Sequence, residues 1–400
     1  MAAMRIVLLN QFYPPDVAPT GRYLHDLARE LVAQGHHVTV IASRHAYGGG
    51  GDFEAREQLD GVEVIRLSGS GFGRDSYLGK LADYTAYVAG LARELARVTK
   101  PELVVALTTP PFLGLLAKLI AEARKARHAH WIMDLYPDAM QAHGIVKNAI
   151  SYKALQALAR RALSGASTVL TLGPVMAERV RPYVSGDTRV EWVPLWTLDG
   201  IEPASAEAAS ALRVSRGWER DRLVLLYSGN MGLGHRFEEF LNAARELGPN
   251  GPLWIFSGSG RGRPIVERFV AENPGLPIRI LPHVDNADLA AHLCSADIHL
   301  ASVDPAWDGL ILPSKVQGSF AVGRPVLFVG SEQHEIAQWI RESQGGWHFL
   351  PGDIAGLTRA VRETAPMEHR DKGTAARRFA GDFFSLDTNV RRVAEQLLRP

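Results

Sequence analysis

Short apolar, β-branched runs alternate with longer segments of helical periodicity along the whole chain. In the first half, the pattern predicts strands at Ile6–Leu9, His37–Ile41, Val62–Leu67, Leu103–Leu107, Trp131–Met133 and Thr168–Thr171. It predicts helices at Gly21–Gln34, Leu78–Val98, Phe112–Arg127 and Ser151–Leu163. Apolar strands that are each followed by a crossover helix are typical of a parallel sheet covered on both faces.

The alternation stops over residues 196–221, which are rich in small and polar residues and show no strand pattern. We interpret this segment as a connection that contains a short helix. Beyond it, strands are expected at Leu223–Tyr227, Leu253–Ser257, Ile278–Leu281, Ile298–Ala301 and Pro325–Val329. Helices are expected at Arg236–Leu247, Pro264–Glu272, Asp288–Cys294, Ser331–Arg341 and Ile354–Glu363. The chain is therefore predicted to be an α/β protein of two doubly wound, Rossmann-like domains.

Doubly wound sheets bind ligands outside the carboxyl ends of their strands, so two such domains facing each other would enclose a deep cleft. We expect the first domain at residues 1–200 and the second at residues 201–380. Residues 381–400 contain an amphipathic helix whose apolar face carries Val390, Val393, Ala394, Leu397 and Leu398. This helix packs either on its own domain or back on the first one.

Composition excludes several classes of function. A formal net charge of +1 gives no case for nucleic acid as the main partner. Cys294 is the only cysteine, which excludes a disulfide framework and a cysteine-based metal site. The first apolar run, Arg5–Leu9, is too short for a signal peptide, and no run reaches the roughly 18 apolar residues of a membrane span. A cytoplasmic protein is therefore expected.

One local stretch, Lys147–Arg161, is basic and amphipathic. It combines four cationic side chains with apolar residues such as Ile150 and Leu158. Such a helix either makes peripheral contact with anionic lipid at the inner face of the membrane or is a solvated helix face.

A glycine-rich turn follows the first strand of the second domain. Residues Ser228–Phe237 include Gly229 and Gly232 and end at a predicted helix start. Glycines let the backbone approach an anion closely, and the N–H groups of a first helical turn point toward it. We therefore interpret the turn as a candidate diphosphate cradle with Arg236 as its counter-charge. Ser257–Gly262 repeats the pattern one unit later and is a second candidate for phosphate contact.

The loop before Gly323 contains a second candidate anion site. Pro313 and Ser314 mark a helix start, where the Ser314 hydroxyl either caps the helix or is free for a phosphate. Lys315 then adds positive charge where the helix dipole is already positive. That placement is unfavourable unless an anion occupies the site, so Lys315 is the strongest indication of anion binding in the sequence.

Five short motifs lie in order along nearly the whole chain, namely Asn10–Pro15, Gly35–Val40, Met133–Asp138, Pro313–Lys315 and Gly323–Val326. Their residues and order resemble the retaining family-4 glycosyltransferases of the GT-B fold. The closest resemblance is to the branch that builds bacterial surface polysaccharides such as colanic acid and O-antigen. The motifs are specific for fold and reaction and say little about which sugars are used.

The chain also departs from that family. Many members carry a Glu-x7-Glu pair, which falls on Leu310 and Gly318 here, so both carboxylates are missing. The second carboxylate normally holds the nucleotide ribose. Ribose recognition is then different in this chain, or it is shared with Asp308 or Gln317.

The resemblance implies transfer of a hexosyl or N-acetylhexosaminyl group from a nucleotide-diphosphate sugar, with UDP favoured, to a saccharide or lipid-linked saccharide. It implies retention of configuration and no metal or other cofactor. The family's diphosphate-binding Arg and Lys fall on Asn230 and Arg236, so one charge is retained, and Lys315 is a candidate for the other. Fixed positive groups of this kind stabilise the charge that develops on a leaving diphosphate.

Site residues follow from these motifs. The donor side is expected to comprise Gly229, Asn230, Gly232, Arg236, Ser257, Gly258, His283, Val284, Asp308, Leu312, Pro313, Ser314 and Lys315. The acceptor side is expected to comprise Pro15, Thr20, Gly21 and Asp134 in the first domain. We assign catalytic roles to Asp134, Arg236 and Lys315, while Thr20 and Asp134 have helix capping as an alternative role.

Three alternatives remain at this point. A GT-B nucleotide-sugar 2-epimerase would need further carboxylates in the cleft. A nicotinamide-dependent dehydrogenase would need a GxGxxG after the first strand, which is absent. A sugar-binding protein of two α/β lobes is usually exported, and the sequence shows no signal peptide.

Overall fold

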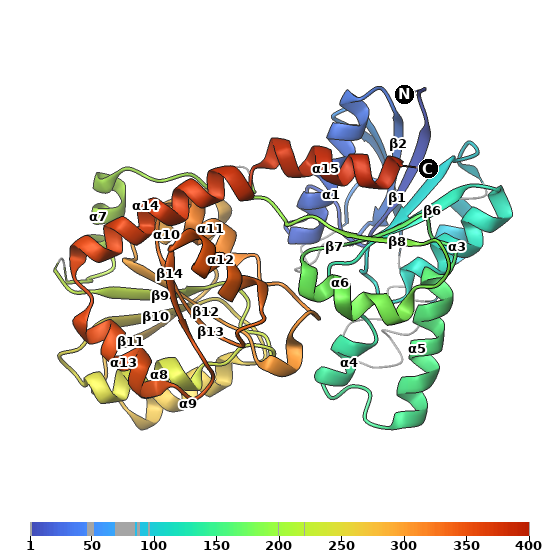
Figure 1. Ribbon diagram of the computed structural model, residues 1–400. Helices are drawn as coiled ribbons and strands as arrows, with labels where there is room; N and C mark the ends of the chain where they lie inside the picture. The colour runs from blue at the N-terminus through green and yellow to red at the C-terminus, as the bar shows by residue number, and fades with distance from the viewer. Residues whose placement is uncertain are drawn as a thin grey trace. The chain divides into compact units, whose positions relative to one another are not determined.

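The computed structural model describes residues 2–45, 52–68, 85, 89–94, 97–198, 200–219 and 221–399. The chain forms two compact units (Figure 1). Unit 1 comprises Met1–Pro194, Gly309–Leu312 and Asp387–Pro400, and unit 2 comprises Leu195–Asp308 and Pro313–Leu386. Each unit has its own sheet flanked by helices, which confirms the predicted α/β class with two Rossmann-like domains.

Unit 1 contains an eight-stranded sheet of order β3-β4-β2-β1-β5-β6-β7-β8, in which only the β3–β4 pair is antiparallel. Its strands are β1 (Arg5–Leu9), β2 (His37–Ser43), β3 (Arg56–Leu59), β4 (Val62–Leu67), β5 (Leu103–Ala106), β6 (Arg127–Trp131), β7 (Thr168–Thr171) and β8 (Arg189–Trp192). Its helices are α1 (Pro19–Ala33), α3 (Leu113–Arg124), α4 (Asp138–Ala142), α5 (Ala149–Leu163), α6 (Pro174–Val180) and α15 (Leu386–Leu398). Of the helix expected at Leu78–Val98, only residues 85, 89–94, 97 and 98 lie within the described residues.

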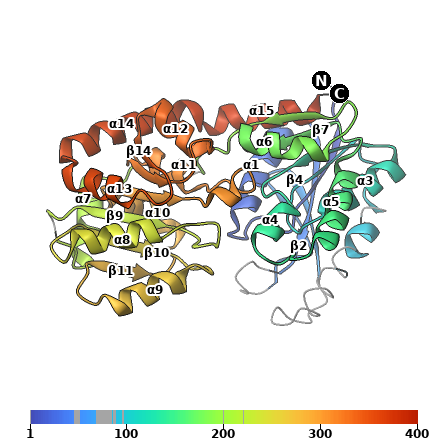
Figure 2. The same ribbon diagram turned by 60° about the horizontal axis from the view of Figure 1, so that its bottom comes forward.

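Unit 2 contains a six-stranded parallel sheet of order β11-β10-β9-β12-β13-β14. Its strands are β9 (Val224–Ser228), β10 (Leu253–Ser257), β11 (Ile278–Leu281), β12 (Ile298–Ser302), β13 (Val326–Val329) and β14 (Gly346–Phe349). Its helices are α7 (Ala206–Ser215), α8 (Glu238–Leu247), α9 (Arg263–Glu272), α10 (Asn286–Cys294), α11 (Lys315–Ala321), α12 (Glu335–Ser343), α13 (Ile354–Glu363) and α14 (Pro366–Phe383). Helices α8, α9 and α13 cover one face of this sheet (Figure 2), and their buried side chains join its hydrophobic core.

The strand predictions were wrong mainly where polar residues enter a sheet. The strand predicted at Trp131–Met133 is β6, which in the structure ends at Trp131. The prediction missed the residues before Trp131 because they include His128 and His130, whose polar side chains are buried. β3, β8 and β14 were not predicted. Each is an edge strand, and edge strands carry polar side chains because one side of them lacks a strand partner.

The last helix, α15, belongs to unit 1 although it follows unit 2 in the chain. Its apolar face is buried, including Val393 and Leu397. Two arginines of unit 1 donate to carbonyl oxygens at its carboxyl end: Arg127 to Leu398 at 3.2 Å, and Arg189 to Arg399 at 3.1 Å. Cations at this end of a helix are favourable because they oppose its dipole.

None of the described helices is both long enough and apolar enough to cross a bilayer. The unit 1 helices are instead amphipathic or small-residue helices that lie on the sheet. In α3, for example, Leu113, Ala117 and Ala121 are the buried positions. The spacing of four residues places them on one face of the helix, toward the apolar strands.

Candidate active site

The candidate site of unit 2 lies where the strand order of its sheet reverses. β9 is flanked by β10 on one side and β12 on the other, and doubly wound sheets bind ligands outside the carboxyl ends of such strands. Hydrogen bonds join the loops after β9 and β12. The Arg236 N–H donates to Ser302 Oγ at 3.0 Å, and the Asp304 N–H donates to the Gly234 carbonyl at 2.9 Å. The glycine-rich turn therefore has a fixed position at this edge.

The two glycine-rich turns hydrogen-bond to each other. The Gly229 N–H donates to the Ser257 carbonyl at 2.9 Å, and the Met231 N–H donates to the Ser259 carbonyl at 2.7 Å. A Cβ atom on Gly258 would lie 2.0 Å from the Gly229 carbonyl oxygen. Close packing therefore accounts for Gly258 without a phosphate, and the second turn supports the first.

A third loop, after β11, reaches the same edge. The Ser257 hydroxyl donates to the Pro282 carbonyl at 2.8 Å, and a Cβ on Gly258 would lie 3.4 Å from the His283 ring. His283 is exposed and Val284 is half-buried. The predicted donor residues Gly229, Gly258 and His283 are thus neighbours at the ends of three adjacent strands.

Lys315 opens α11 and reaches toward the first glycine turn. Its Nζ lies 3.6 Å from the centre of the Tyr227 ring, and its Cε lies 3.8 Å from the Cβ position of Gly229. The Nζ is buried and, among the described residues, has no hydrogen-bond partner. Burial lowers the pKa of Lys315 well below its ordinary value. A buried ammonium with only an aromatic face beside it is costly, and a bound anion would offset that cost.

Two partners of Lys315 were missed by the sequence reasoning. Tyr227 belongs to the apolar run of β9 and looks like a core residue in the sequence. His235 packs edge-on against Tyr227, with ring centres 5.8 Å apart, and its Nδ1–H donates to the Ser302 carbonyl at 2.6 Å. Burial, together with the charge of Lys315, lowers the pKa of His235 to about 3, so this imidazole is neutral.

The structure gives Arg236 a different setting from the one expected. Helix α8 begins at Glu238 rather than at Arg236, and two glutamates stand in its first turn. The Arg236 guanidinium donates to Glu239 Oε1 at 2.6 and 2.8 Å and to Asp304 Oδ2 at 3.1 Å. Its charge is therefore already paired with the carboxylates of Glu239 and Asp304. These ion pairs fix the position of the turn, so Arg236 is not an unpaired positive charge available to a diphosphate.

The remaining donor-side residues divide between the units. Ser314 is the N-cap residue of α11, but its side chain makes no capping hydrogen bond, so the hydroxyl is not used by the helix. Ser331 Oγ donates to Asp308 Oδ2 in unit 2. Gln317 is buried, and neither of its amide atoms has a hydrogen-bond partner among the described residues. Leu312, in contrast, belongs to unit 1.

Asn230 and Gly232 lie on the first glycine turn itself. The side-chain nitrogen of Asn230 lies 3.5 Å from the Cβ position of Gly232, and its oxygen lies 2.5 Å from that of Gly260. Asn230 thus fills the space between the two turns. Pro313 directly precedes the Ser314 cap of α11.

In unit 1, Asp134 stands just beyond β6. Its backbone N–H and that of Met133 both donate to Thr108 Oγ, at 3.2 and 3.3 Å, which ties the loops after β5 and β6 together. Desolvation raises the pKa of Asp134 to about 6. A carboxyl group whose pKa lies near neutral can accept or hold a proton, as a group that contacts a sugar hydroxyl requires.

The other acceptor-side residues lie near the start of α1. The helix begins at Pro19 with Ala18 as N-cap, so the capping role considered for Thr20 is wrong. Thr20 Oγ1 instead accepts a hydrogen bond from Asn10 Nδ2 at 3.4 Å. A Cβ on Gly21 would lie 3.0 Å from the Phe12 backbone, so glycine is needed there for close packing. Pro15 is exposed on the loop between them.

Comparisons with known proteins find similarity to glycosyltransferases. The model of the glycosyl transferase 4-like domain family matches residues 20–196. The chain is 23% identical to the probable glycosyltransferase WbjE of Pseudomonas aeruginosa over 284 residues, and this aligned region covers 70% of each protein. It is 23% identical over 397 residues to the putative colanic acid biosynthesis glycosyl transferase WcaI of Escherichia coli, which covers 94% of this chain and 95% of WcaI.

Solved structures share the fold. Sucrose-phosphate synthase from Thermosynechococcus elongatus has a TM-score of 0.77 at 17% identity, covering 98% of both chains. Anabaena HepE, in complex with UDP and glucose, has a TM-score of 0.73 at 14% identity, covering 98% of this chain and 99% of HepE. Residues 20–196 thus match the glycosyl transferase 4-like domain, the chain has the GT-B fold, and over most of its length it is similar to bacterial glycosyltransferases.

Proposed function

We propose that this glycosyltransferase moves a hexosyl or N-acetylhexosaminyl group from a UDP-sugar to a saccharide or lipid-linked saccharide, with retention, in surface-polysaccharide biosynthesis. The observation that carries the donor assignment is the buried Nζ of Lys315 beside Gly229, which has no hydrogen-bond partner in the described part of the chain. A diphosphate placed there would give that ammonium its missing partner. HepE, which shares the fold, has been crystallised with UDP and with UDP-glucose.

In this proposal, each chain residue has a role that its surroundings support. Lys315 stabilises the charge that develops on the leaving diphosphate, and the Ser314 hydroxyl, free of a capping bond, contacts the same phosphates. Arg236 holds the turn through Glu239 and Asp304. We propose that these fixed groups make a metal unnecessary and that the departing phosphate accepts the acceptor's proton.

A panel of nucleoside diphosphates and their sugars tests the donor assignment. UDP or a UDP-sugar should raise the melting temperature, whereas the matching purine nucleotides should not. Release of UDP from the effective sugar should continue in the presence of EDTA. A protein stabilised by no member of the panel, or a transfer rate that EDTA abolishes and Mg²⁺ restores, would contradict the corresponding part of the proposal.

Asp134→Asn is expected to lower transfer by about tenfold or more, because it removes a charge-assisted hydrogen bond that would position the acceptor hydroxyl, with UDP affinity unchanged. The substitution should also raise the free energy of unfolding, by an amount that depends on pH. The folded pKa of about 6 lies above the unfolded value of ~3.9, so wild-type stability falls as pH rises from about 4 to 6. The variant should therefore be more stable than wild type by about 1–2 kcal/mol at pH 8, and by progressively less toward pH 4.

Urea unfolding at pH 4, 6 and 8 measures this difference, and Asp187→Asn, which removes an exposed carboxylate of unit 1, is the control for carboxylate removal. A stability gain that is the same at all three pH values would contradict the buried-carboxyl interpretation. The transfer assay also separates the alternatives, because a 2-epimerase would release the free epimer of the donor sugar instead of a glycosylated product.

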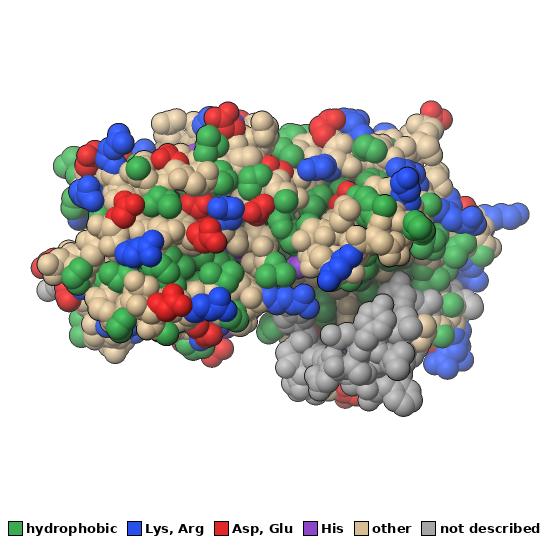
Figure 3. All heavy atoms as spheres, turned by 90° about the horizontal axis from the view of Figure 1, so that it is seen from below, with side chains coloured by type: hydrophobic (Ala, Val, Ile, Leu, Met, Phe, Trp, Pro, Cys, Tyr) green, Lys and Arg blue, Asp and Glu red, His purple; other side chains and the backbone are tan. Residues whose placement is uncertain are grey.

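We further propose that the segment from Ile145 to Arg161 contacts the anionic surface where a lipid-linked acceptor resides. Ile150 is 83% exposed and Ile145 is 56% exposed, and both are large apolar side chains. Four cations and no acidic residue lie in this stretch. On the face drawn in Figure 3, Lys and Arg side chains lie at the surface beside apolar ones. Apolar side chains beside uncompensated positive charge suit an anionic bilayer surface.

Co-sedimentation with phosphatidylglycerol vesicles tests this surface. Ile150→Ser should lower the bound fraction roughly tenfold, because burying an isoleucine side chain contributes about 1.5–3 kcal/mol. Val214→Ser, which alters a side chain that is 70% exposed in unit 2, should leave the bound fraction unchanged. Equal binding to neutral phosphatidylcholine vesicles, or equal loss in both variants, would rule out the proposed contact.

A further inference from the structure

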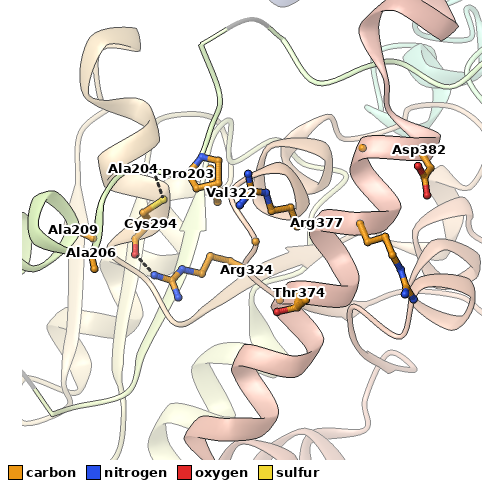
Figure 4. A pocket seen from close by; sticks show the side chains of 14 residues that line it. Pro203, Ala204, Ala206, Ala209, Cys294, Val322, Arg324, Thr374, Arg377 and Asp382 are labelled. Carbon is orange, nitrogen blue, oxygen red and sulfur yellow. Dashed lines mark hydrogen bonds between the residues drawn. The ribbon is translucent and has the colours of Figure 1, made fainter.

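A pocket of about 710 Å³ lies within unit 2, away from the candidate donor site. Its walls come from the start of α7, the turn between α11 and β13, and one side of α14 (Figure 4). Arg324 and Cys294 stand just before β13 and β12, so the pocket is at the amino-terminal edge of the sheet. Lys315 is at the carboxyl-terminal edge, about 10 Å away along the seven residues of α11. None of the predicted donor residues lines the pocket.

Three arginines line this pocket, and none of them has a carboxylate partner among the residues that the structure describes. Arg324 donates to the Cys294 carbonyl at 2.6 Å, while its buried Nε has no hydrogen-bond partner among the described residues. Arg377 and Arg378 of α14 are exposed, and neither forms an ion pair with any residue that the structure describes. The one acidic lining residue is Asp382, so the lining carries a net positive charge.

The two opposed walls are held together by backbone packing. Gly323 has a φ of +71°, and a Cβ on Gly373 would lie 2.2 Å from the Gly323 carbonyl oxygen. Helix α14 therefore rests directly on the turn that carries Arg324. One helical turn after Gly373, the stem of Arg377 lies 3.8 Å from the Cβ position of Gly323. Figure 4 shows Arg377 reaching from α14 toward Val322 and Pro203.

We infer that this pocket binds a phosphate monoester of a sugar or polyol. The phosphate would lie between Arg324 and Arg377, because planar guanidinium groups bind phosphate through paired, charge-assisted hydrogen bonds. An ester hydroxyl would donate to Thr374 Oγ, whose own hydrogen is used on the Arg370 carbonyl. The volume lies within the range of small-molecule sites. This inference does not depend on the proposed donor chemistry.

Calorimetric titration of the full-length protein with glucose 6-phosphate, in the presence of saturating UDP, tests the site. Wild type should bind the ester with UDP present. Arg377→Ala should weaken its dissociation constant at least tenfold, whereas Arg370→Ala, an equally exposed arginine of the same helix outside the pocket, should not change it. Both changes are at exposed positions, so folding is preserved and circular dichroism verifies it.

Two further measurements distinguish failure of this pocket proposal from failure of the donor-site proposal. Lys315→Met should bind glucose 6-phosphate like wild type, so a failure of UDP binding leaves this test intact. Inorganic phosphate should bind at least several-fold more weakly than the ester, and equal affinity would overturn the role given to Thr374. No binding of the ester at about 10 mM, displacement by UDP, or equal effects of the Arg370 and Arg377 changes would overturn the site.

Discussion

Lys315→Met is expected to weaken UDP binding by about 1.5–3 kcal/mol, or roughly 10- to 150-fold, while making the ligand-free protein more stable. The two effects have one cause. The Nζ of Lys315 is buried without a hydrogen-bond partner among the described residues, so its charge destabilises the empty protein and becomes favourable only when an anion arrives. Replacing such a charge with an apolar side chain of similar volume should add about 1–3 kcal/mol to the free energy of unfolding.

The gain in stability should depend on pH. Because the folded pKa of Lys315 lies well below its unfolded value, the unfolded chain holds more protons between those two values. Wild-type stability therefore rises with pH across that window. The advantage of Lys315→Met should be largest below the folded pKa and should vanish as the pH approaches about 10.4.

Lys372→Met is the matched control for both measurements. Lys372 also lies over an aromatic ring, 5.0 Å from the centre of Trp347, but it is paired with Glu368 on the surface of α14. This change should leave UDP affinity unaltered and should not raise the melting temperature. A Lys315→Met protein that binds UDP like wild type would remove Lys315 from the donor site.

Arg236→Ala is expected to lower the free energy of unfolding by about 2–4 kcal/mol, with a smaller effect on UDP affinity than that of Lys315→Met. Glu239 is only 2% exposed, and Arg236 supplies its positive partner. Removing the guanidinium leaves a buried carboxylate whose remaining donor among the described residues is the Gly352 N–H, at 3.1 Å, with no positive charge beside it. Urea unfolding measures the loss, and titration with UDP, below the unfolding transition, measures the change in affinity.

Two variants sharpen this test. Arg181→Ala breaks an exposed Arg–Glu pair of the same sequence spacing, in which both side chains are more than half exposed, and should cost less than about 1 kcal/mol. Adding Glu239→Gln to Arg236→Ala should recover part of the lost stability, since the buried charge is then gone. A greater loss of UDP affinity in Arg236→Ala than in Lys315→Met would instead indicate direct contact between Arg236 and the diphosphate.

Much of the fold could be predicted because buried parallel strands are continuous apolar runs. Val62–Leu67 and Leu253–Ser257, for example, were predicted at the observed bounds. β6 was displaced because His128 and His130 are polar residues at buried positions. The edge strand β3, whose sequence is Arg-Glu-Gln-Leu, has no apolar pattern to detect.

The candidate site was predictable only where a residue violates a local rule. Lys315 stands out because a cation in the first turn of a helix is unfavourable. Nothing in the sequence places Tyr227 under that lysine, since the ring belongs to a strand that lies far away along the chain. The link between Arg236 and Asp304 is likewise a product of the fold, because β12 brings the two residues together across 68 positions.

Because α15 packs on unit 1, it affects the order in which the two units can complete folding during synthesis. During synthesis, residues 1–194 emerge first, yet the apolar surface that receives Val393 and Leu397 stays uncovered until residues 387–399 have left the ribosome. Unit 2, in contrast, has all of its strands by residue 349. Unit 2, although it is synthesised later, can therefore finish folding before unit 1. A chain that ends after α14 would leave the apolar surface of unit 1 that receives α15 exposed to solvent.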